Sequence, residues 1–147
     1  MSAPEAVIKE VGASEWQVVV ALRRLVFIDE QGVTEEEEFD EFDAAAIHLL
    51  ATIGDTPVGT LRIRHLDDGE SRIERVAVLL SRRGTGVGRL LMMAAIRTVE
   101  DAGQREITLA GQIQAEGFYV ACGFLAEGTV FSQERIEHRW MRRTITP

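Results

Sequence analysis

Three glycines alternate with other residues in the segment Arg83-Gly84-Thr85-Gly86-Val87-Gly88-Arg89 of this 147-residue chain. Glycine lets the backbone approach a ligand closely, and the free N–H groups in the first turn of a helix attract phosphate. Arg82, Arg83 and Arg89 add positive charge at the same place, in a chain whose net charge is −8. The segment therefore favours a phosphate-binding loop. A glycine-rich turn with solvated arginines is the alternative.

Two common kinds of nucleotide-binding loop fit this segment poorly. A Walker loop has Lys followed by Ser or Thr after its last glycine, whereas Gly88 is followed by Arg89 and Leu90. A dinucleotide-binding loop has glycines in the order G-x-G-x-x-G, whereas here every second residue is glycine. Neither of these two classes of site is favoured.

The residues on either side of the loop predict a strand before it and a helix after it. Residues 72–80 form a β-like run, and apolar side chains recur at helical spacing from Val87 to about Gly103. The other expected elements are strands at 5–11, 47–53, 58–64, 106–109 and 135–145, helices at about 14–32 and 114–122, and an acidic loop or irregular helix at 35–43. This order predicts one mixed α+β domain over residues 1–147.

The composition argues against several classes of protein. An acidic chain is a poor partner for nucleic acid, and no apolar run approaches the roughly 20 residues of a membrane span. The N-terminus lacks the pattern of a signal peptide. The single cysteine, Cys122, fits a reducing compartment, and the three histidines have no zinc-ligand spacing. We therefore expect a cytoplasmic protein without metal, nucleic acid or membrane partners.

The pattern Arg83-x-x-Gly86-x-Gly88 resembles the Q/R-x-x-G-x-G/A signature of the GNAT superfamily of acyl-CoA N-acyltransferases. Residues 72–78 (Arg-Ile-Glu-Arg-Val-Ala-Val) stand where that superfamily has its central strand, and Phe118-Tyr119-x-x-x-Gly123-Phe124 resembles its F-Y-x-x-x-G-F helix. Further segments look like one bacterial subgroup of small GNAT proteins, namely residues 26–32, 38–43 with His48, and 136–141. The resemblance implies the GNAT fold, an α+β fold whose mixed, mostly antiparallel sheet is flanked by helices and splayed between its fourth and fifth strands.

The resemblance also implies acetyl-CoA as a co-substrate. Its pyrophosphate would lie on backbone amides of the glycine loop, and its pantetheine arm would pair with the central strand like an additional strand. The residues concerned are Arg83, Gly84, Thr85, Gly86, Val87, Gly88 and Arg89 in the loop, and Val76, Ala77 and Val78 in the strand. Core packing of the two valine side chains is compatible with this role, because backbone atoms do the binding.

Tyr119 is the first candidate for proton transfer. It is the only tyrosine of the chain, and it matches the tyrosine that in many GNAT enzymes hydrogen-bonds the sulfur of CoA. A phenol at this position would protonate the departing thiolate. The alternative for Tyr119 is a core aromatic residue whose hydroxyl reaches solvent.

Glu74 is the second candidate, as the base that takes the proton of the amine. The strand around it is similar to the strand of glucosamine-6-phosphate N-acetyltransferases that carries an active-site glutamate. Strand alternation places Glu74 on the same face as Val76 and Val78, opposite Arg75. A surface ion pair with a neighbouring strand arginine is an equal alternative for Glu74, and deprotonation through water is common in the family.

Nine acidic residues and no Lys or Arg lie between Leu25 and Ile47. This region usually lines the acceptor site in GNAT folds, and its negative field would attract a cationic amine. A solvated acidic loop is the alternative. The resemblance implies substrate contact or loop ordering for four residues of the region and substrate contact for one near the C-terminus: Glu38, Asp40, Asp43, His48 and His138.

The chain departs from its relatives at two places. Ala110-Gly111 stands where relatives often have a polar residue, and Gln112 is a possible substitute for it. Residues 135–138 read Arg-Ile-Glu-His, where the subgroup pattern predicts Gly-Ile-Pro-His. The turn before His138 therefore departs from the subgroup pattern, and His138 is still expected to face the acceptor.

These observations predict an N-acetyltransferase that transfers acetyl from acetyl-CoA directly to a primary amine in a ternary complex. The acceptor would be a small molecule, for which a positive charge is one option, and a homodimer is compatible with the resemblance. A non-catalytic acyl-CoA-binding or sensing module is the main alternative, and a pure interaction domain is a further one.

Overall fold

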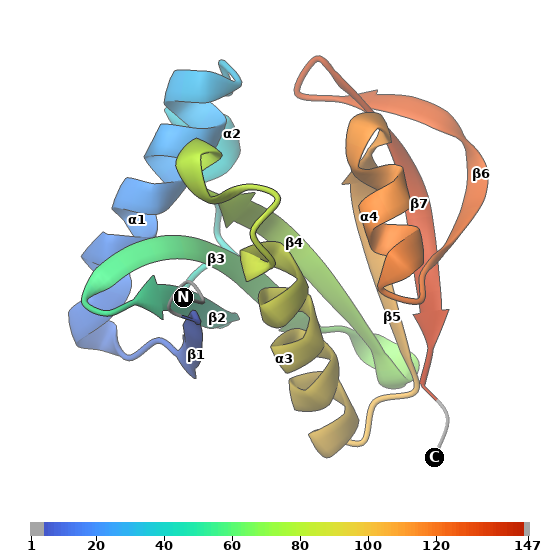
Figure 1. Ribbon diagram of the computed structural model, residues 1–147. Coiled ribbons are helices and arrows are strands. Elements are labelled where there is room, and N and C mark those ends of the chain that lie inside the picture. The colour runs from blue at the N-terminus through green and yellow to red at the C-terminus, as the bar shows by residue number, and fades with distance from the viewer. Residues whose placement is uncertain (1–4, 146–147) are drawn as a thin grey trace.

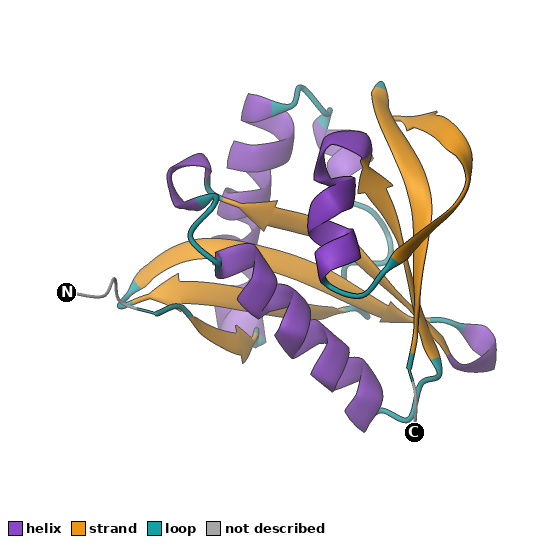
Figure 2. Cartoon of the chain, turned by 45° about the vertical axis from the view of Figure 1, so that its right-hand side comes forward, coloured by secondary structure: helices purple, strands orange, loops and turns teal. Residues whose placement is uncertain are grey.

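Seven strands form one mixed sheet in the computed structural model, which describes residues 5–145 (Figures 1 and 2). The strand order is β1-β2-β3-β4-β5-β7-β6, and only the neighbours β4 and β5 are parallel. The strands are β1 (Val7–Glu10), β2 (Ile47–Ile53), β3 (Thr56–His65), β4 (Glu70–Val78), β5 (Glu106–Gln112), β6 (Leu125–Gln133) and β7 (Ile136–Thr144). The helices are α1 (Trp16–Arg23), α2 (Glu35–Glu38), α3 (Val87–Asp101) and α4 (Glu116–Ala121), with shorter turns η1 (Ala13–Glu15), η3 (Asp67–Gly69), η4 (Leu80–Arg82) and η5 (Ile113–Ala115), and the π-helical η2 (Arg24–Glu30).

The amphipathic helix α3 covers one face of the sheet, and α1 with η2 covers the other (Figure 1). The apolar side of α3 packs against buried side chains of the central strands, among them Ile63 and Ile73. Gly59 of β3 makes this close approach possible, because a Cβ atom there would lie 2.9 Å from Cδ1 of Leu91. On the opposite face, Ala77 of β4 packs against Val26 and Phe27 of η2.

Strands β4 and β5 pair only at their first three residues, where Glu70–Arg72 faces Glu106–Thr108. Beyond Arg72 the two strands separate, so the sheet divides into an arm of β1 to β4 and an arm of β5, β7 and β6 (Figure 2). The expected GNAT-type sheet, splayed between its fourth and fifth strands, is therefore confirmed.

Two elements differ from the sequence prediction. The long helix expected at 14–32 is composite, because the π-helical η2 follows α1 and the chain turns at Gly32 with φ +75°. Strand β6 was not expected, since its residues are exposed along most of its length and lack an alternation of buried and exposed positions. The segment 35–43, expected as an acidic loop or irregular helix, begins with the short helix α2.

Candidate functional site

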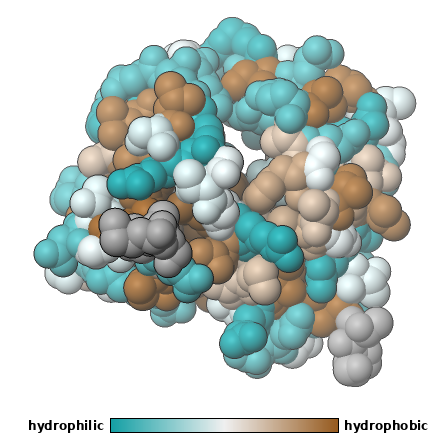
Figure 3. All heavy atoms as spheres, in the orientation of Figure 1, coloured by the Kyte–Doolittle hydropathy of each residue, from teal (hydrophilic) through white to brown (hydrophobic). Residues whose placement is uncertain are grey.

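A cavity of about 440 Å³ lies between the two arms of the sheet (Figure 3). Its walls come from η2 and β4 on one side and from β5, α4 and β7 on the other. Because β5 leaves β4 after Arg72, the edge of β4 that faces the cavity has no strand partner there among the described residues. Its backbone is thus available to pair with an extended ligand.

A β-bulge in β4 changes the direction of the side chains at this edge. Thr60 faces Ala77 and Arg62 faces Glu74, so β4 carries one extra residue, and Arg75 has φ +58°. The alternation predicted from the sequence is wrong here. Glu74 pairs with Arg62, and Arg75 does not turn to the opposite face but binds Asp40, which Arg62 also binds.

The same bulge determines the direction of the valine side chains of β4. Val76 and Val78 pack against the core beneath α3, and both line the cavity, whereas Ala77 is buried against η2. Glu74 also lines the cavity, but it shares a face with Ala77 and not with the two valines. The predicted coenzyme strand is therefore next to the cavity. Val76 and Val78 share a face as expected, but Glu74 lies on the other face.

The glycine loop stands at the end of β4 and leads into α3. Gly84 and Gly86 have φ of +78° and +97°, and Gly86 is the N-cap of α3 without a side-chain cap. This left-handed backbone leaves the first N–H groups of the helix uncovered by a side chain. Gly88 lies against Phe118, because a Cβ atom there would be 3.2 Å from Cζ of that ring.

Only part of the predicted loop lines the cavity. Arg83, Gly84 and Gly88 do so, whereas the other four members, Thr85, Gly86, Val87 and Arg89, lie outside its lining. Arg83 is held in place by Glu30, at 2.6 and 2.7 Å, and donates to the carbonyl of Val78 at 2.9 Å. The Arg83 guanidinium also holds the pKa of the Glu30 carboxyl below its usual value.

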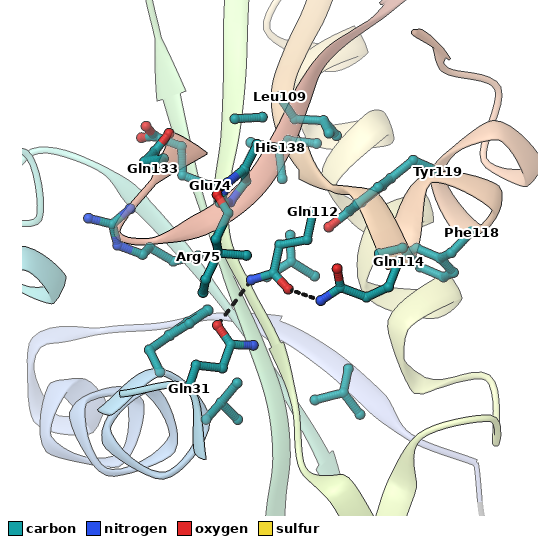
Figure 4. Close-up of a pocket in the computed structure, with 18 of the residues that line it drawn as sticks. Gln31, Glu74, Arg75, Leu109, Gln112, Gln114, Phe118, Tyr119, Gln133 and His138 are labelled. Carbon is teal, nitrogen blue, oxygen red and sulfur yellow. Dashed lines mark hydrogen bonds between the residues drawn. The ribbon is translucent and has the colours of Figure 1, made fainter. Parts of the chain in front are cut away.

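Tyr119 projects from α4 into the cavity, with its hydroxyl directed toward Gln112 (Figure 4). The side chain is 8% exposed, and burial raises the pKa of its phenol well above the ordinary value. The Tyr119 hydroxyl has no hydrogen-bond partner among the described residues, so it is a free donor at neutral pH. Gly111 provides the space for the ring, since a Cβ atom there would lie 3.1 Å from its Cδ2. The unusual Ala110-Gly111 pair therefore accommodates Tyr119.

Buried arginines neutralise much of the acidic region. Arg23 of α1, 1% exposed, binds Glu38 and Asp43, each at 2.7 Å. Arg62 of β3, also 1% exposed, binds Asp40 at 2.7 Å and Asp43 at 2.8 Å. Desolvation raises the pKa of Glu38 despite these arginines. For Asp40 and Asp43 the arginine contacts outweigh desolvation, and both pKa values lie below the ordinary one.

The predicted substrate residues of this region hold the loop in place. Asp40, Asp43 and His48 lie outside the lining of the cavity, whereas Glu38 is part of it. Nε2 of His48 is 2.9 Å from the carbonyl oxygen of Asp43, and burial lowers the pKa of this imidazole. The contacts therefore support loop ordering for these three residues, which the sequence left open beside substrate contact. Direct substrate contact for them stays a prediction.

Glu74 lies in the same network. Its Oε1 accepts from Arg62 at 2.8 Å and from Arg64 at 3.3 Å. Arg75 donates to the carbonyl of Glu38 at 3.1 Å and to Asp40 at 3.2 Å. These contacts favour the ion-pair alternative for Glu74, with the buried Arg62 as one partner, and a catalytic role for Glu74 stays a prediction. The contacts of Arg75 join the bulge of β4 to the loop that carries α2.

Replacing Arg62 with methionine is expected to lower the free energy of unfolding by about 3–5 kcal/mol, because Asp40, Asp43 and Glu74 each lose one of their arginine partners. Urea unfolding of the two proteins measures this difference. Arg24→Met is the matched control: Arg24 pairs with Glu35 on the surface, where such a pair contributes about 1 kcal/mol or less. Equal losses in both variants would contradict a structural role for the network.

Side chains join the two arms again across the cavity. Nε2 of Gln112 donates to Gln31 of the opposite arm at 3.0 Å (Figure 4). Arg135 binds both carboxylate oxygens of Glu37, at 2.9 and 3.1 Å. This arginine, helped by the backbone of Thr34, lowers the pKa of Glu37 to about 2.

The turn between β6 and β7 shows how the chain accommodates Arg135 where the subgroup pattern has glycine. Gln133 pairs with Ile136, and the two residues between them, Glu134 and Arg135, have φ of +47° and +65°. This is the backbone of a two-residue hairpin turn, in which left-handed residues match the twist of the strands. Arg135 thus keeps the backbone that glycine would adopt, and His138 lines the cavity.

Sequence reasoning missed several residues of the cavity, among them Gln31, Gln114 and Arg75. The signal for Gln114 was its position at the start of the helix expected at 114–122. No helix among residues 5–145 is long and apolar enough to cross a membrane. Within the same residues, no cluster of three or more His, Cys, Asp or Glu side chains has the arrangement of a metal site.

Comparisons with known proteins agree with this architecture. The model of the acetyltransferase (GNAT) family matches residues 16–124. The uncharacterized N-acetyltransferase YjcF of Bacillus subtilis (strain 168) is 39% identical over 103 residues, which cover 70% of this chain and 73% of that protein. Protein ElaA of Escherichia coli (strain K12) is 28% identical over 140 residues, 92% of each chain.

Solved structures share the fold over almost the whole chain. The crystal structure of Escherichia coli ElaA has a TM-score of 0.81 at 26% identity and covers 95% of this chain and 99% of that one. An acyl-CoA N-acyltransferase from Pseudomonas aeruginosa also has a TM-score of 0.81 at 26% identity, with coverage of 96% and 99%. The narrower likeness of the Glu74 strand to glucosamine-6-phosphate N-acetyltransferases stays a prediction. The family model, the relatives and the divided sheet together show that this chain belongs to the GNAT family of acetyltransferases.

Proposed function

We propose that the protein transfers the acetyl group of acetyl-CoA to the nitrogen of a primary amine, with both substrates bound at the same time. The separation of β4 from β5 after Arg72 is the observation that carries this proposal. It opens one cavity that has the glycine loop at one end, an unpaired strand edge along one wall and the Tyr119 hydroxyl on the other. The GNAT family uses acetyl-CoA, and these features fit its pyrophosphate, its pantetheine amides and its thioester.

The coenzyme would lie along β4. Backbone N–H groups from Gly84 to Arg89 would bind the pyrophosphate, since the uncapped start of α3 supplies donors and partial positive charge. The amides of the pantetheine arm would pair with the free edge of β4 near Val76 and Val78. The thioester then lies near Tyr119, between the two arms.

In the reaction the amine nitrogen attacks the thioester carbon, and a C–N bond forms. The carbonyl oxygen becomes an oxyanion, which backbone N–H groups of the bulged strand would stabilise. The C–S bond then breaks and the sulfur leaves with the electron pair; the nitrogen loses a proton to a base or water in the cavity, and Tyr119 gives the sulfur a proton that it regains from solvent. The protein thus contributes mainly the proximity and orientation of two bound substrates.

The acceptor would bind beyond the thioester, where neutral polar side chains are prominent. Gln31, Gln112 and Gln133 line this region, with Trp140 beside them. Because Arg23, Arg62 and Arg75 already pair with acids nearby, we infer that hydrogen bonds to the body of the amine matter more than its total charge.

A panel of amines tests the proposed function. Thiol release from acetyl-CoA is measured with polyamines, amino sugars and amino acids, and mass spectrometry identifies the product. We expect at least one amine to accelerate thiol release and to gain one acetyl group, with no acetyl group on the isolated protein, because no acyl-enzyme forms. Tight binding of acetyl-CoA without thiol release on any amine would support a sensing module instead.

A further inference from the structure

We propose that His138 is the base that takes the proton of the attacking amine, through the Nε2 nitrogen of its ring. This inference rests on the proposed acetyl transfer and adds the residue that the transfer requires. A primary amine is mostly protonated at neutral pH, so it must lose a proton before it can attack. The base has to face the cavity and must have a lone pair that no other group occupies.

His138 lies in β7, within the wall formed by the β5 arm. Its neighbour across the β5–β7 pair is Gln112, and its neighbour in β6 is Phe131, whose ring stacks on the imidazole at 5.8 Å. The side chain is 6% exposed and lines the cavity, close to Glu74 in the view of Figure 4. Stacking on Phe131 and the contact of Nδ1 with the Ile136 carbonyl therefore hold the ring in one orientation.

A backbone contact determines which ring nitrogen carries the proton. Nδ1 of His138 lies 2.7 Å from the carbonyl oxygen of Ile136. A carbonyl oxygen only accepts hydrogen bonds, so Nδ1 carries the hydrogen and Nε2 has the free lone pair of the neutral ring. Nε2 has no hydrogen-bond partner within residues 5–145. When Nε2 accepts a proton, the bond from Nδ1 becomes charge-assisted and helps to stabilise the cation.

The carboxylates of the cavity are less suitable. Glu74 is engaged by Arg62 and Arg64, and Glu38 is engaged by Arg23. Glu134 belongs to the tip of the β6–β7 hairpin and not to the strand wall. The other charged side chains of the lining are Arg72 and Arg75, with Glu30 and Arg83 at the end near the glycine loop.

The two strands that pair with β7 bring His138 no titratable cross-strand neighbour, and Glu74 of β4 is the carboxylate that Figure 4 shows near it. Gln112 of β5 and Phe131 of β6 are neutral. Glu137 and Arg139 adjoin His138 in β7, and strand alternation turns them to the other face. Within residues 5–145, Nε2 of His138 therefore has a lone pair that no hydrogen bond occupies.

The pH dependence of kcat in three variants tests this role. His138→Asn keeps a donor for the Ile136 carbonyl but has no Nε2, whereas Glu74→Gln and Glu134→Gln remove the competing carboxylates. The wild-type kcat should decrease at low pH, because a protonated imidazole cannot accept the amine proton. We expect His138→Asn to lose about 100-fold or more in kcat together with this acid limb, and both glutamine variants to keep the limb.

Two further measurements separate the possible failures. Titration with CoA reports whether His138→Asn still folds and binds the coenzyme, and in the wild type the ¹⁵N shift of Nε2 should follow the same midpoint as the acid limb. A His138→Asn protein that retains the limb, a limb lost in Glu74→Gln or Glu134→Gln, or a mismatch of the two midpoints would overturn the proposal. Absence of acetyl transfer by the wild type to any amine would instead overturn the proposed function.

Discussion

Replacing Gly86 with valine is expected to weaken the binding of CoA about 100-fold or more. Gly86 has φ +97° at the start of α3, a backbone conformation that a β-branched residue adopts only with strain. Relief of the strain should move the first N–H groups of the helix away from the proposed pyrophosphate site. Loss of two charge-assisted hydrogen bonds, at about 1.5–3 kcal/mol each, accounts for a change of this size. Isothermal titration calorimetry measures it.

Gly12→Ala is the matched control for this variant. Gly12 has φ −89°, and a Cβ atom there has no neighbour within 4 Å, so alanine fits without strain. We expect this control to bind CoA like the wild type. If Gly86→Val, shown to be folded, bound CoA with an unchanged dissociation constant, the glycine loop would not be the pyrophosphate site.

Removing the hydroxyl of Tyr119 is expected to reduce kcat about 100-fold and to leave the dissociation constant of CoA nearly unchanged. General acid catalysis typically contributes about 10²–10⁴ in rate, and phenylalanine fills the same space beside Gly111. Steady-state thiol release and calorimetry on Tyr119→Phe separate the two quantities. Full turnover by this variant would show that Tyr119 is a core aromatic residue only.

The pH dependence provides a second check on Tyr119. Burial raises the pKa of its phenol, so the proton that it would donate is retained to higher pH than in a free phenol, whose ordinary pKa is about 10. Loss of activity from ionisation of Tyr119 should therefore begin only above that value. A basic limb well below pH 10 that disappears in Tyr119→Phe would contradict the assignment.

Much of the fold could be predicted from local sequence patterns. The spacing of apolar residues from Val87 onward is periodic because α3 buries one face against the sheet. Strand β6 could not be predicted, because it lies at the edge of the sheet with exposed residues on both faces. The π-helical part that follows α1 has no pattern of its own, since its buried residues Val26 and Phe27 are adjacent.

Those parts of the candidate site could be predicted that depend on the types of residues close together in the sequence. The glycine loop belongs to this kind, because a left-handed backbone favours glycine in the sequence. Tyr119 was predicted from its match to the F-Y-x-x-x-G-F pattern, and its catalytic role stays a prediction. The direction of Glu74 was not predictable, since the bulge at Arg75 breaks the alternation on which the prediction relied. The charge of the acidic region was also misleading, because its arginine partners come from α1, β3 and β4.

Amide hydrogen exchange with and without CoA tests the central claim most directly, namely that the divided sheet is a coenzyme site. Bound coenzyme should slow exchange at the N–H groups of residues 84–89 and along the cavity edge of β4, with little change in β1 and β2 at the far side of the sheet. Unchanged exchange in both segments at saturating CoA would show that the coenzyme does not bind between the arms.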